Sequence, residues 1–498
     1  MSTTEKKFLR LFALCLQIVF LAVTGSAQDF EANIKLAPDA PTTVQIKGKI
    51  LSQKISDSNK SWSFVRSAPN AENLGERIAN FNLLNAQAQA VTVKKLVPGE
   101  YLADGQAANW SYQANLQPPN PSAMAHVSWI EDEQGILMTG DLLPQFAATS
   151  NEPISAKITF ELPANWKIIS REKKLSNGKF FVSDVEKAIF LIGKQWREKE
   201  ISVDKNALNF AIFGEWKFSD DEAFQMADEI FAEYKKLLGD VPFENARINL
   251  IHFPKEINFD RWEAETRGAN VTILSSDMPF KTLSLQRLHE QLRHEIFHLW
   301  LPNSLALSGN YAWFYEGFTV YQSLRTALEM NQIRFEDFLA TLEQAHFIDS
   351  RRLRKLSLVE ASKNRLNTTS STVYARGMLV AFLCDATLLK NSRGKRSITD
   401  LFRQILKLHR VSNKTVDGNT AVLNLLDSYP ELRPIIKKYV LAAEKINWQT
   451  ELESTGIEAQ ESNSAVRLQV KIKLNNQQKN LLEKLGYNNW RKSLGKSK

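Results

Sequence analysis

The sequence contains little cysteine, with 2 residues in 498, and its 20 glycines and 16 prolines are no excess for this length. No segment of about 20 to 50 residues recurs along the chain. These absences exclude solenoid, collagen-like, disulfide-rich and low-complexity classes. The chain is 43% hydrophobic, so it can form the cores of about two or three ordinary domains.

One of the two cysteines, Cys15, lies in an N-terminal segment that is typical of a secretory signal peptide. Basic residues precede an apolar run over residues 11–23, and small residues follow it. We predict that residues 1–27 are removed before Gln28, which gives a secreted or periplasmic bacterial protein without stable membrane insertion. An uncleaved N-terminal membrane anchor is the alternative. The mature chain then keeps only Cys384, so it forms no internal disulfide.

The formal net charge of +8 is modest for this length, and the excess of basic residues is concentrated at the C-terminus. Residues 464–498 carry nine Lys or Arg and one Glu. A nucleic-acid site also needs interleaved aromatic side chains or a recognisable motif, and neither accompanies this tail. We therefore interpret the tail as a solvated surface and exclude nucleic acid as a partner.

The pattern of apolar residues changes part-way along the chain. Short alternating or apolar stretches, separated by Asn, Gly, Pro and Asp, predict strands over residues 28–217. Ser219 then begins a helix with a capping box completed by Glu222, and residues 218–446 are mainly helical. Residues 447–498 form an extension that ends in the basic tail. The sequence therefore predicts an α+β multidomain protein, with a β-rich domain of sandwich or saddle type before a helical one.

A candidate metal site lies in the helix predicted over residues 282–300. His294 and His298 are one turn apart, on the side of the helix away from its apolar stripe, so both imidazoles can bind one ion. Glu295, the next residue round, can reach a water on that ion. A solvated face that carries two histidines by chance is the alternative, and a third ligand must decide between them. The apolar stripe consists of Leu285, Leu288, Leu292, Ile296 and Leu299.

Glu316 is the third candidate ligand, because it lies in a run that is too aromatic to be a surface. Residues 313–315 and 318 are all aromatic. An ionised carboxylate in such surroundings is costly to bury unless a cation compensates it. That cation is either zinc, held by the two histidines, or an arginine such as Arg325. Two histidines and one glutamate leave a fourth zinc position open, which is the catalytic arrangement, with one Zn2+ per chain.

Such a site predicts a hydrolase that acts on a peptide or protein substrate. Zinc lowers the pKa of its water and polarises a carbonyl, while Glu295 accepts the proton as general base and passes it to the leaving amine. The oxyanion needs a further hydrogen-bond donor. Tyr374, at the start of a very apolar helix, is either that donor or a core aromatic.

Three segments, in order and spacing, resemble the gluzincin zinc metallopeptidases. They are HEIFHLWLPN (294–303), WFYEGFTVY (313–321) and VYARGMLVAFLCDATL (373–388). The glycyl aminopeptidase family is the nearer match and the membrane alanyl aminopeptidase family the more distant one. The resemblance covers about residues 218–445, and it implies that this part is a thermolysin-like catalytic domain.

The resemblance also implies roles for individual residues: His294, His298 and Glu316 as zinc ligands, Glu295 as general base and Tyr374 as oxyanion donor. Arg376 stands where these families often carry a Lys, and it would face the substrate. The strand expected at the edge of the sheet, residues 267–276, lacks the glutamate that binds the substrate's free amine in the alanyl type. Glu263 and Glu265 lie just before it and could replace that glutamate. We expect an aminopeptidase, with two alternatives: an endopeptidase with the same zinc site, or a non-catalytic peptide-binding protein on a peptidase scaffold.

Overall fold

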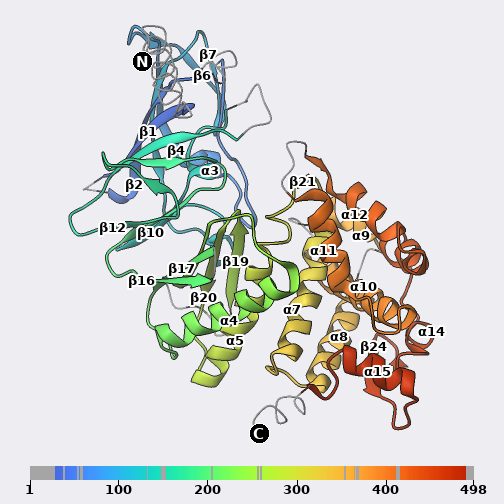
Figure 1. Cartoon of the computed structure of the whole chain (residues 1–498). Helices are drawn as coiled ribbons and strands as arrows, with labels where there is room; N and C mark the ends of the chain where they lie inside the picture. Colours follow the sequence, from blue (N-terminus) through green and yellow to red (C-terminus); the bar gives the residue numbers. More distant parts are fainter. Residues whose placement is uncertain are drawn as a thin grey trace, which may run out of the picture. The chain divides into compact units, whose positions relative to one another are not determined.

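The structure is a computed structural model of the chain, which divides into two compact units (Figure 1). The first consists of Met1–Asn120 and Val127–Lys194, and the second of Pro121–His126 and Gln195–Lys498. The predicted signal peptide and the end of the basic tail lie outside the described residues. The structure describes residues 28–489 except 38–39, 53–54, 56–59, 132, 147–152, 204–205, 255–256, 258–260, 353–354, 364, 366–369 and 411–414.

The first unit is built mainly from three sheets, whose strands follow the apolar alternation of the sequence. In β8 (Asn109–Asn115), Trp110, Tyr112 and Ala114 are buried and the residues between them are not, because successive side chains point to opposite faces of a strand. The strand orders are β13-β14-β11-β1-β2-β8-β4-β5, β12-β15-β10-β9 and β3-β7-β6. The other elements are β1 (Phe30–Ala37), β2 (Ala40–Ile50), β3 (Ser61–Ser63), β4 (Ile78–Leu84), β5 (Ala90–Val91), β6 (Val93–Val97), β7 (Glu100–Ala103), β9 (Trp129–Glu131), β10 (Gln134–Met138), α3 (Thr139–Leu142), β11 (Ala156–Glu161), β12 (Lys167–Ile169), β13 (Lys173–Lys174), β14 (Phe180–Val182) and β15 (Ile189–Gly193).

The two larger sheets of this unit share one hydrophobic core. Ile34 and Ile46 of the eight-stranded sheet and Leu137 and Phe190 of the four-stranded sheet are all fully buried in it. Burial of one apolar face of each sheet is the main stabilising term of such an arrangement. The predicted fold class, a β-rich N-terminal part followed by a helical part, is confirmed.

The second unit begins with a mixed sheet of order β16-β17-β18-β20-β19. β17, β18 and β20 are parallel, while β16 and β19 run antiparallel at the two edges. The prediction that residues 267–276 form the edge strand is wrong, because the chain turns back at Gly268 and places β20 inside the sheet and β19 at its edge. The strands are β16 (Arg197–Val203), β17 (Asn206–Phe213), β18 (Asn245–His252), β19 (Trp262–Arg267) and β20 (Asn270–Ser275).

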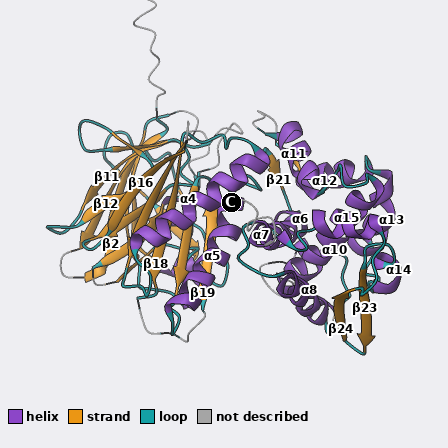
Figure 2. Cartoon of the chain, turned by 60° about the horizontal axis from the view of Figure 1, so that its bottom comes forward, coloured by secondary structure: helices purple, strands orange, loops and turns teal. Residues whose placement is uncertain are grey.

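Two helices cover part of this sheet (Figure 2). α4 (Asp220–Leu238) begins with the predicted capping box, in which the hydroxyl of Ser219 accepts a hydrogen bond from the backbone N–H of Glu222. α5 (Lys281–Phe297) contacts β19 and β20. It ends earlier than predicted and continues through Ser304 as hydrogen-bonded turns. β16 and β17 precede the predicted boundary near residue 217, but they pair into this sheet, so the compact unit starts before it.

The later helices assemble around α10 (Ser370–Asn391), which contacts α7, α8 and α9 (Figure 1). Among the described helices, α10 alone is long and apolar enough to cross a membrane, and 89% of that stretch is buried inside the protein, as in a central core helix. Cys384 on this helix is buried and free, as predicted. The surrounding elements are β21 (Leu307–Ser308), α6 (Ala312–Tyr315), α7 (Gly317–Glu329), α8 (Phe335–Ser350), α9 (Leu358–Lys363), α11 (Ile398–His409), β22 (Val416–Asp417) and α12 (Gly418–Asp427).

Two glycines allow α7 and α10 to approach unusually closely. A Cβ on Gly317 would lie 2.4 Å from the Cα of Gly377, and a Cβ on Gly377 would lie 2.7 Å from the Cα of Gly317. Both distances are shorter than a normal carbon contact of about 3.5–4.0 Å. Glu316 immediately precedes the first glycine and Tyr374 lies three residues before the second, so this crossing brings the two side chains together.

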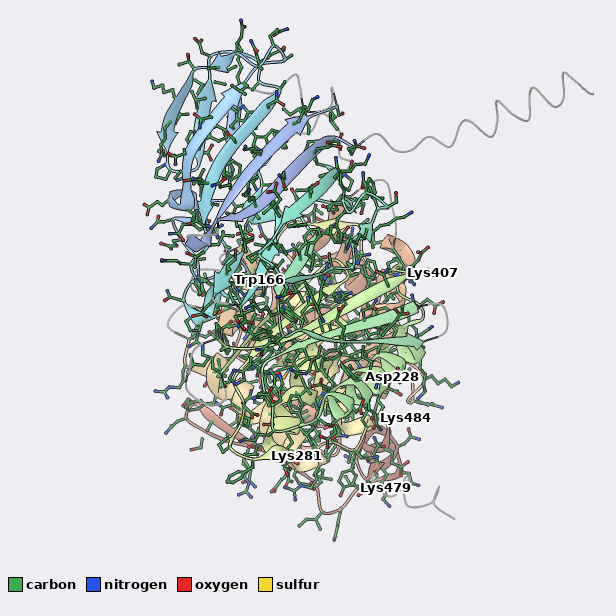
Figure 3. All side chains as sticks on the ribbon, turned by 90° about the vertical axis from the view of Figure 1, so that its left-hand side faces the viewer. Trp166, Asp228, Lys281, Lys407, Lys479 and Lys484 are labelled. Carbon is green, nitrogen blue, oxygen red and sulfur yellow. The ribbon has the colours of Figure 1, made fainter. Side chains whose placement is uncertain are left out.

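The segment after residue 446 is part of the second unit rather than a separate module. Trp448, Leu468 and Leu482 are buried in the same core as the helices around α10. Lys479 and Lys484 of the basic tail are exposed (Figure 3), in agreement with a solvated surface. The elements here are η4 (Pro430–Leu432), α13 (Arg433–Ile435), the π-helical η5 (Ile436–Leu441), α14 (Trp448–Leu452), β23 (Ile457–Ser462), β24 (Ala465–Val470) and α15 (Asn476–Lys484).

Candidate active site

The end of α5 brings two imidazoles together. His294 lies in the last turn of the helix and His298 is the first residue after it, so the two side chains stack one turn apart on one face. Their Nε2 atoms are 3.1 Å apart. Donor atoms of His294, Glu295 and His298 all lie within 4.8 Å of one another, and the group could hold a metal ion.

A backbone contact sets the tautomer of His298. Its Nδ1 is 2.7 Å from the carbonyl oxygen of Leu301, so Nδ1 carries the hydrogen and donates it to that oxygen in the neutral ring. The lone pair is then on Nε2, the atom that faces His294. A hydrogen bond of this kind at the far nitrogen is the usual way in which a protein orients a metal-binding histidine.

Glu316 completes the cluster from the junction of α6 and α7. Its Oε2 atom lies 3.4 Å from the Nε2 atom of His294 and 3.4 Å from that of His298. The residue is 4% exposed, and Oε2 has no hydrogen-bond partner among the described residues. A buried carboxylate oxygen without a partner is costly, so this atom lacks a cation or a donor.

Arg365 neutralises the other oxygen of the same carboxylate. One of its nitrogens lies 2.6 Å from Oε1 of Glu316. The alternative partner considered from the sequence, Arg325, instead forms an ion pair with Asp385 at 2.7 Å. Burial alone would raise the pKa of Glu316, but Arg365 and the imidazole of His298 outweigh it and hold that pKa well below its ordinary value. The carboxylate is therefore ionised and presents Oε2 to the two imidazoles.

The spacing of the three atoms fits a tetrahedral metal. Zinc bonds to nitrogen and oxygen are about 2.0–2.2 Å long, so two ligand atoms of a tetrahedron are about 3.4 Å apart. The distances between Nε2 of His294, Nε2 of His298 and Oε2 of Glu316 are 3.1, 3.4 and 3.4 Å. Two neutral imidazoles and one carboxylate are also the donor types that zinc prefers. These residues could hold one zinc ion with a further position open.

Glu295 is held in a different way from Glu316. Its Oε1 atom is 3.9 Å from Nε2 of His294, and its Oε2 atom accepts a hydrogen bond of 2.8 Å from the hydroxyl of Thr266. The same hydroxyl is 3.0 Å from the backbone carbonyl of Glu295. One carboxylate oxygen is thus fixed by the edge strand β19, and the other is directed to the cluster as an acceptor.

Tyr374 faces the cluster from the first turns of α10. Its ring centroid is 6.2 Å from that of His294, and Nη2 of Arg365 donates to its hydroxyl oxygen at 3.1 Å. Burial, and then the charge of Glu316, raise the pKa of Tyr374 well above its ordinary value. The phenol therefore stays protonated and can donate a hydrogen bond.

A cavity of about 310 Å³ adjoins the cluster within the second unit. Strand β19 and helices α5, α7, α8 and α10 form its walls, and Glu263, His294, Glu295 and Tyr374 lie on it. Burial raises the pKa of Glu263, although His126 and Arg261 oppose the rise. The edge strand β19 therefore carries an acid at the cavity, as is required if Glu263 binds the free amine of a peptide substrate.

Glu265, the other acid considered, is occupied by neighbours. It forms an ion pair with Arg267 at 2.9 Å and a hydrogen bond with Nδ1 of His126 at 3.1 Å. Arg267 also donates to the backbone oxygen of His126. These contacts tie the segment Pro121–His126 to β19, and the structure does not place Glu265 on the cavity wall.

Comparisons with known proteins identify solved structures that have this fold. No protein-family model matches the chain, and no curated protein matches it. An aminopeptidase N family protein of Idiomarina loihiensis aligns with 86% of this chain and 79% of its own, at a TM-score of 0.74 and 15% identity. An M1 zinc metallopeptidase of Deinococcus radiodurans aligns with 82% of this chain and 92% of its own, at a TM-score of 0.51 and 13% identity. The fold is that of the M1 zinc metallopeptidases.

A third match is a mutant of the Deinococcus M1 enzyme with the substrate Tyr-Ser-Ala bound. It aligns with 82% of this chain and 92% of its own, at a TM-score of 0.52 and 12% identity. Identities this low establish the M1 fold alone. The case for a zinc site in this chain depends on its own donor atoms, those of His294, His298 and Glu316.

Within this M1 fold, Arg376 does not have the position expected from the sequence. It is fully buried and forms an ion pair with Asp349 at 3.0 Å. Its other nitrogens donate to the backbone oxygens of Tyr439 and Glu444. The side chain leaves α10 on the side away from the cavity, because residues 374 and 376 are about 200° apart around a helix. All the observed partners are structural, so the expectation that Arg376 faces the substrate is not supported.

Two residues of the site were missed in the sequence. Thr266 fixes Glu295, and Arg365 joins Glu316 to Tyr374. Arg365 also donates to the hydroxyl of Tyr315 at 2.9 Å. No periodicity surrounds Arg365, so its role had no sequence signal. For Thr266 there was a partial signal, since a hydroxyl next to an acid pair in an edge strand is a plausible partner for a carboxylate.

Proposed function

We propose that this protein is a zinc-dependent peptidase, with His294, His298 and Glu316 as the metal ligands. The observation that carries the proposal is the buried Oε2 of Glu316, which has no hydrogen-bond partner and lies 3.4 Å from both imidazoles. The M1 fold supports it independently, because the family's solved members include zinc metallopeptidases. Zinc, when bound, polarises the scissile carbonyl and makes a water more acidic.

The remaining residues supply proton transfer and charge stabilisation. Glu295 accepts a proton from the attacking water at its free oxygen and later passes it to the leaving amine. Thr266 holds the second oxygen of that carboxylate in place. Tyr374 donates its phenolic hydrogen to the oxyanion that forms at the scissile carbonyl. Arg365 orients Tyr374, because it donates a hydrogen bond to the phenolic oxygen.

The proposed activity is that of an aminopeptidase. In the described sheet, β19 is paired on one side only, so its free edge can bind an extended peptide as an additional strand. Glu263 lies on this strand and on the cavity wall, where its carboxylate can bind the ammonium group of a peptide's first residue. The mutant Deinococcus enzyme has the substrate Tyr-Ser-Ala bound, and this supports the proposal of a short peptide substrate for this cavity.

Acetylation of the substrate tests the aminopeptidase assignment. We expect cleavage of Ala-Ala-Ala-amide and no cleavage of its N-acetylated form, and we expect Glu263→Gln to raise KM for the free peptide. Glu265→Gln is the matched control, because that acid is held by Arg267 and His126 and is not on the cavity wall. Glu263, by contrast, lies on the wall and has only the exposed Arg261 as an ion-pair partner among the described residues, at 3.3 Å. Equal cleavage of both peptides would mean an endopeptidase. A zinc-loaded protein that binds peptides but cleaves none would be a non-catalytic binding protein.

We also propose that the protein works outside the cytoplasm. The N-terminal charge and apolar pattern support cleavage before Gln28. N-terminal sequencing of the protein from a bacterial periplasmic fraction should start at or near Gln28. Recovery of the chain with Met1 from the membrane fraction would support an anchor instead.

A further inference from the structure

Arg293 is the only Arg or Lys among the described residues on the wall of the active-site cavity, and the chemistry proposed above does not use it. It immediately precedes His294 on α5 and lies on the cavity wall together with Glu263 and Glu295. The residue is only 6% exposed. A guanidinium is charged at every pH at which a protein is folded. Arg293 therefore places a permanent positive charge beside the metal cluster.

No carboxylate neutralises this charge among the described residues. The partner of Arg293 is the ring of His289, one turn earlier on α5, which accepts from Nη1 at its Nδ1 atom. The buried Nε of Arg293 has no hydrogen-bond partner. Glu290, three residues earlier on the same helix and also on the cavity wall, forms its ion pair with Arg287 at 3.4 Å, so its charge acts on Arg293 without an ion pair. Tyr234 also reaches this turn, where its hydroxyl donates to the backbone oxygen of Arg293.

The contact with His289 orients the arginine without compensating its charge. Burial, and then the charge of Arg293, lower the pKa of His289 to about 3, so the imidazole is neutral and acts as an acceptor. A buried cation without a counter-ion is strongly unfavourable. By contrast, the buried arginines Arg325 and Arg376 each have a carboxylate at 3.0 Å or less. Arg293 differs from them in that it lies on the cavity wall and has no ion pair there.

We propose that Arg293 forms a carboxylate-binding subsite of the cleft. The inference rests on the proposed peptidase function, since it assigns the subsite to a peptide substrate. A carboxylate matches the planar fork of a guanidinium and would satisfy its Nε donor, which has no hydrogen-bond partner in the described part of the chain. Its source is either the acidic side chain of a residue next to the scissile bond or the C-terminus of a short peptide. With Glu263 on β19, the cavity presents one group for an ammonium and one for a carboxylate.

Binding of paired peptides to a zinc-loaded Glu295→Gln protein tests this subsite without turnover. Three pairs of peptides separate the possible sources of the carboxylate. Glu-Ala-Ala-amide against Gln-Ala-Ala-amide and Ala-Glu-Ala-amide against Ala-Gln-Ala-amide test an acidic side chain, and Ala-Ala against Ala-Ala-amide tests the C-terminus. Isothermal titration calorimetry gives Kd for each. We expect one pair to show about a 10- to 100-fold preference for the carboxylate form, as for a charge-assisted hydrogen bond.

The preference should disappear when Arg293→Gln is added and remain with Arg287→Gln. Arg287 is the matched control, because it lies on the same helix and carries the same charge, but its ion pair is with Glu290. Even if Arg293→Gln does not fold, the peptide pairs still test for a carboxylate preference in the protein in which Arg293 is intact. Peptide binding without any preference in the three pairs would overturn the subsite alone. Absence of binding and of cleavage for every peptide would overturn the proposed function, and the subsite with it.

Discussion

Substitution of Gly377 by Ala should disturb the active site through the packing of two helices. The new Cβ would lie 2.7 Å from the Cα of Gly317 and 2.7 Å from the carbonyl oxygen of Trp313. Both neighbours are backbone atoms, which cannot rotate away. Normal contact requires about 3.5–4.0 Å, so α7 and α10 must move apart by about 1 Å.

The expected size of the effect follows from that displacement. Overpacking of this kind costs about 1–3 kcal/mol, and each 1 kcal/mol lowers Tm by about 2–4 °C in a domain of about 200 residues. Glu316 precedes Gly317 directly, and Tyr374 lies one turn before Gly377. The distance between the side chains of Glu316 and Tyr374 therefore changes when α7 and α10 move apart. A misplacement of about 1 Å can reduce turnover by about 100-fold.

Two assays on one preparation check this prediction. Differential scanning calorimetry gives Tm, and hydrolysis of Ala-Ala-Ala-amide gives kcat and KM. Gly105→Ala is the matched control, because its Cβ would meet only a side-chain atom of Val91, at 3.8 Å. A Gly377→Ala protein with unchanged Tm and kcat would refute the close crossing of α7 and α10 as the feature that places Tyr374.

Three further substitutions separate chemistry from structure. Glu295→Gln should keep its metal and lose about 100- to 10,000-fold in kcat, because an amide cannot accept the proton; substantial turnover with zinc bound would contradict its role as base. Tyr374→Phe should also keep its metal and lose about 10- to 1,000-fold in kcat, with little change in KM; normal kcat would make Tyr374 a core aromatic. Arg376→Met should cost about 1–3 kcal/mol in the free energy of unfolding, measured in urea, because Asp349 loses one of two buried ion-pair partners and keeps Arg352 at 2.7 Å. Its KM should not change, whereas a rise in KM at full stability would restore the substrate role.

Local periodicity explains why the sequence predicted the centre of the site. His294 and His298 are one helical turn apart, so the end of one helix brings both together without any long-range information. Glu316 was found because an acid in an aromatic run requires a cation. In the structure Arg365, which the sequence reasoning did not consider, neutralises one oxygen of Glu316, and the other oxygen has no hydrogen-bond partner among the described residues.

The parts that were missed depend on tertiary contacts. Arg365 reaches Glu316 and Tyr374 across the fold from a stretch without regular periodicity. The sequence did not predict that β19 is the edge strand. The chain turns back at Gly268, and the pairing of β19 with β20, rather than the apolar pattern, decides which strand is outermost. Arg376 has the spacing of a site residue, but it lies on the far side of α10 from Tyr374, and only the packing around Asp349 shows this.

The metal content of the purified protein tests the central claim most directly. Elemental analysis after exposure to zinc and removal of the excess should find one zinc per chain in the natural sequence. His294→Ala and Glu316→Ala should each lose it, while the Lys281→Ala control, at the exposed start of the same helix (Figure 3), should not. Circular dichroism would verify that each variant is folded. Zinc retained in full by a folded Glu316→Ala protein, or no zinc in the natural protein, would contradict the account.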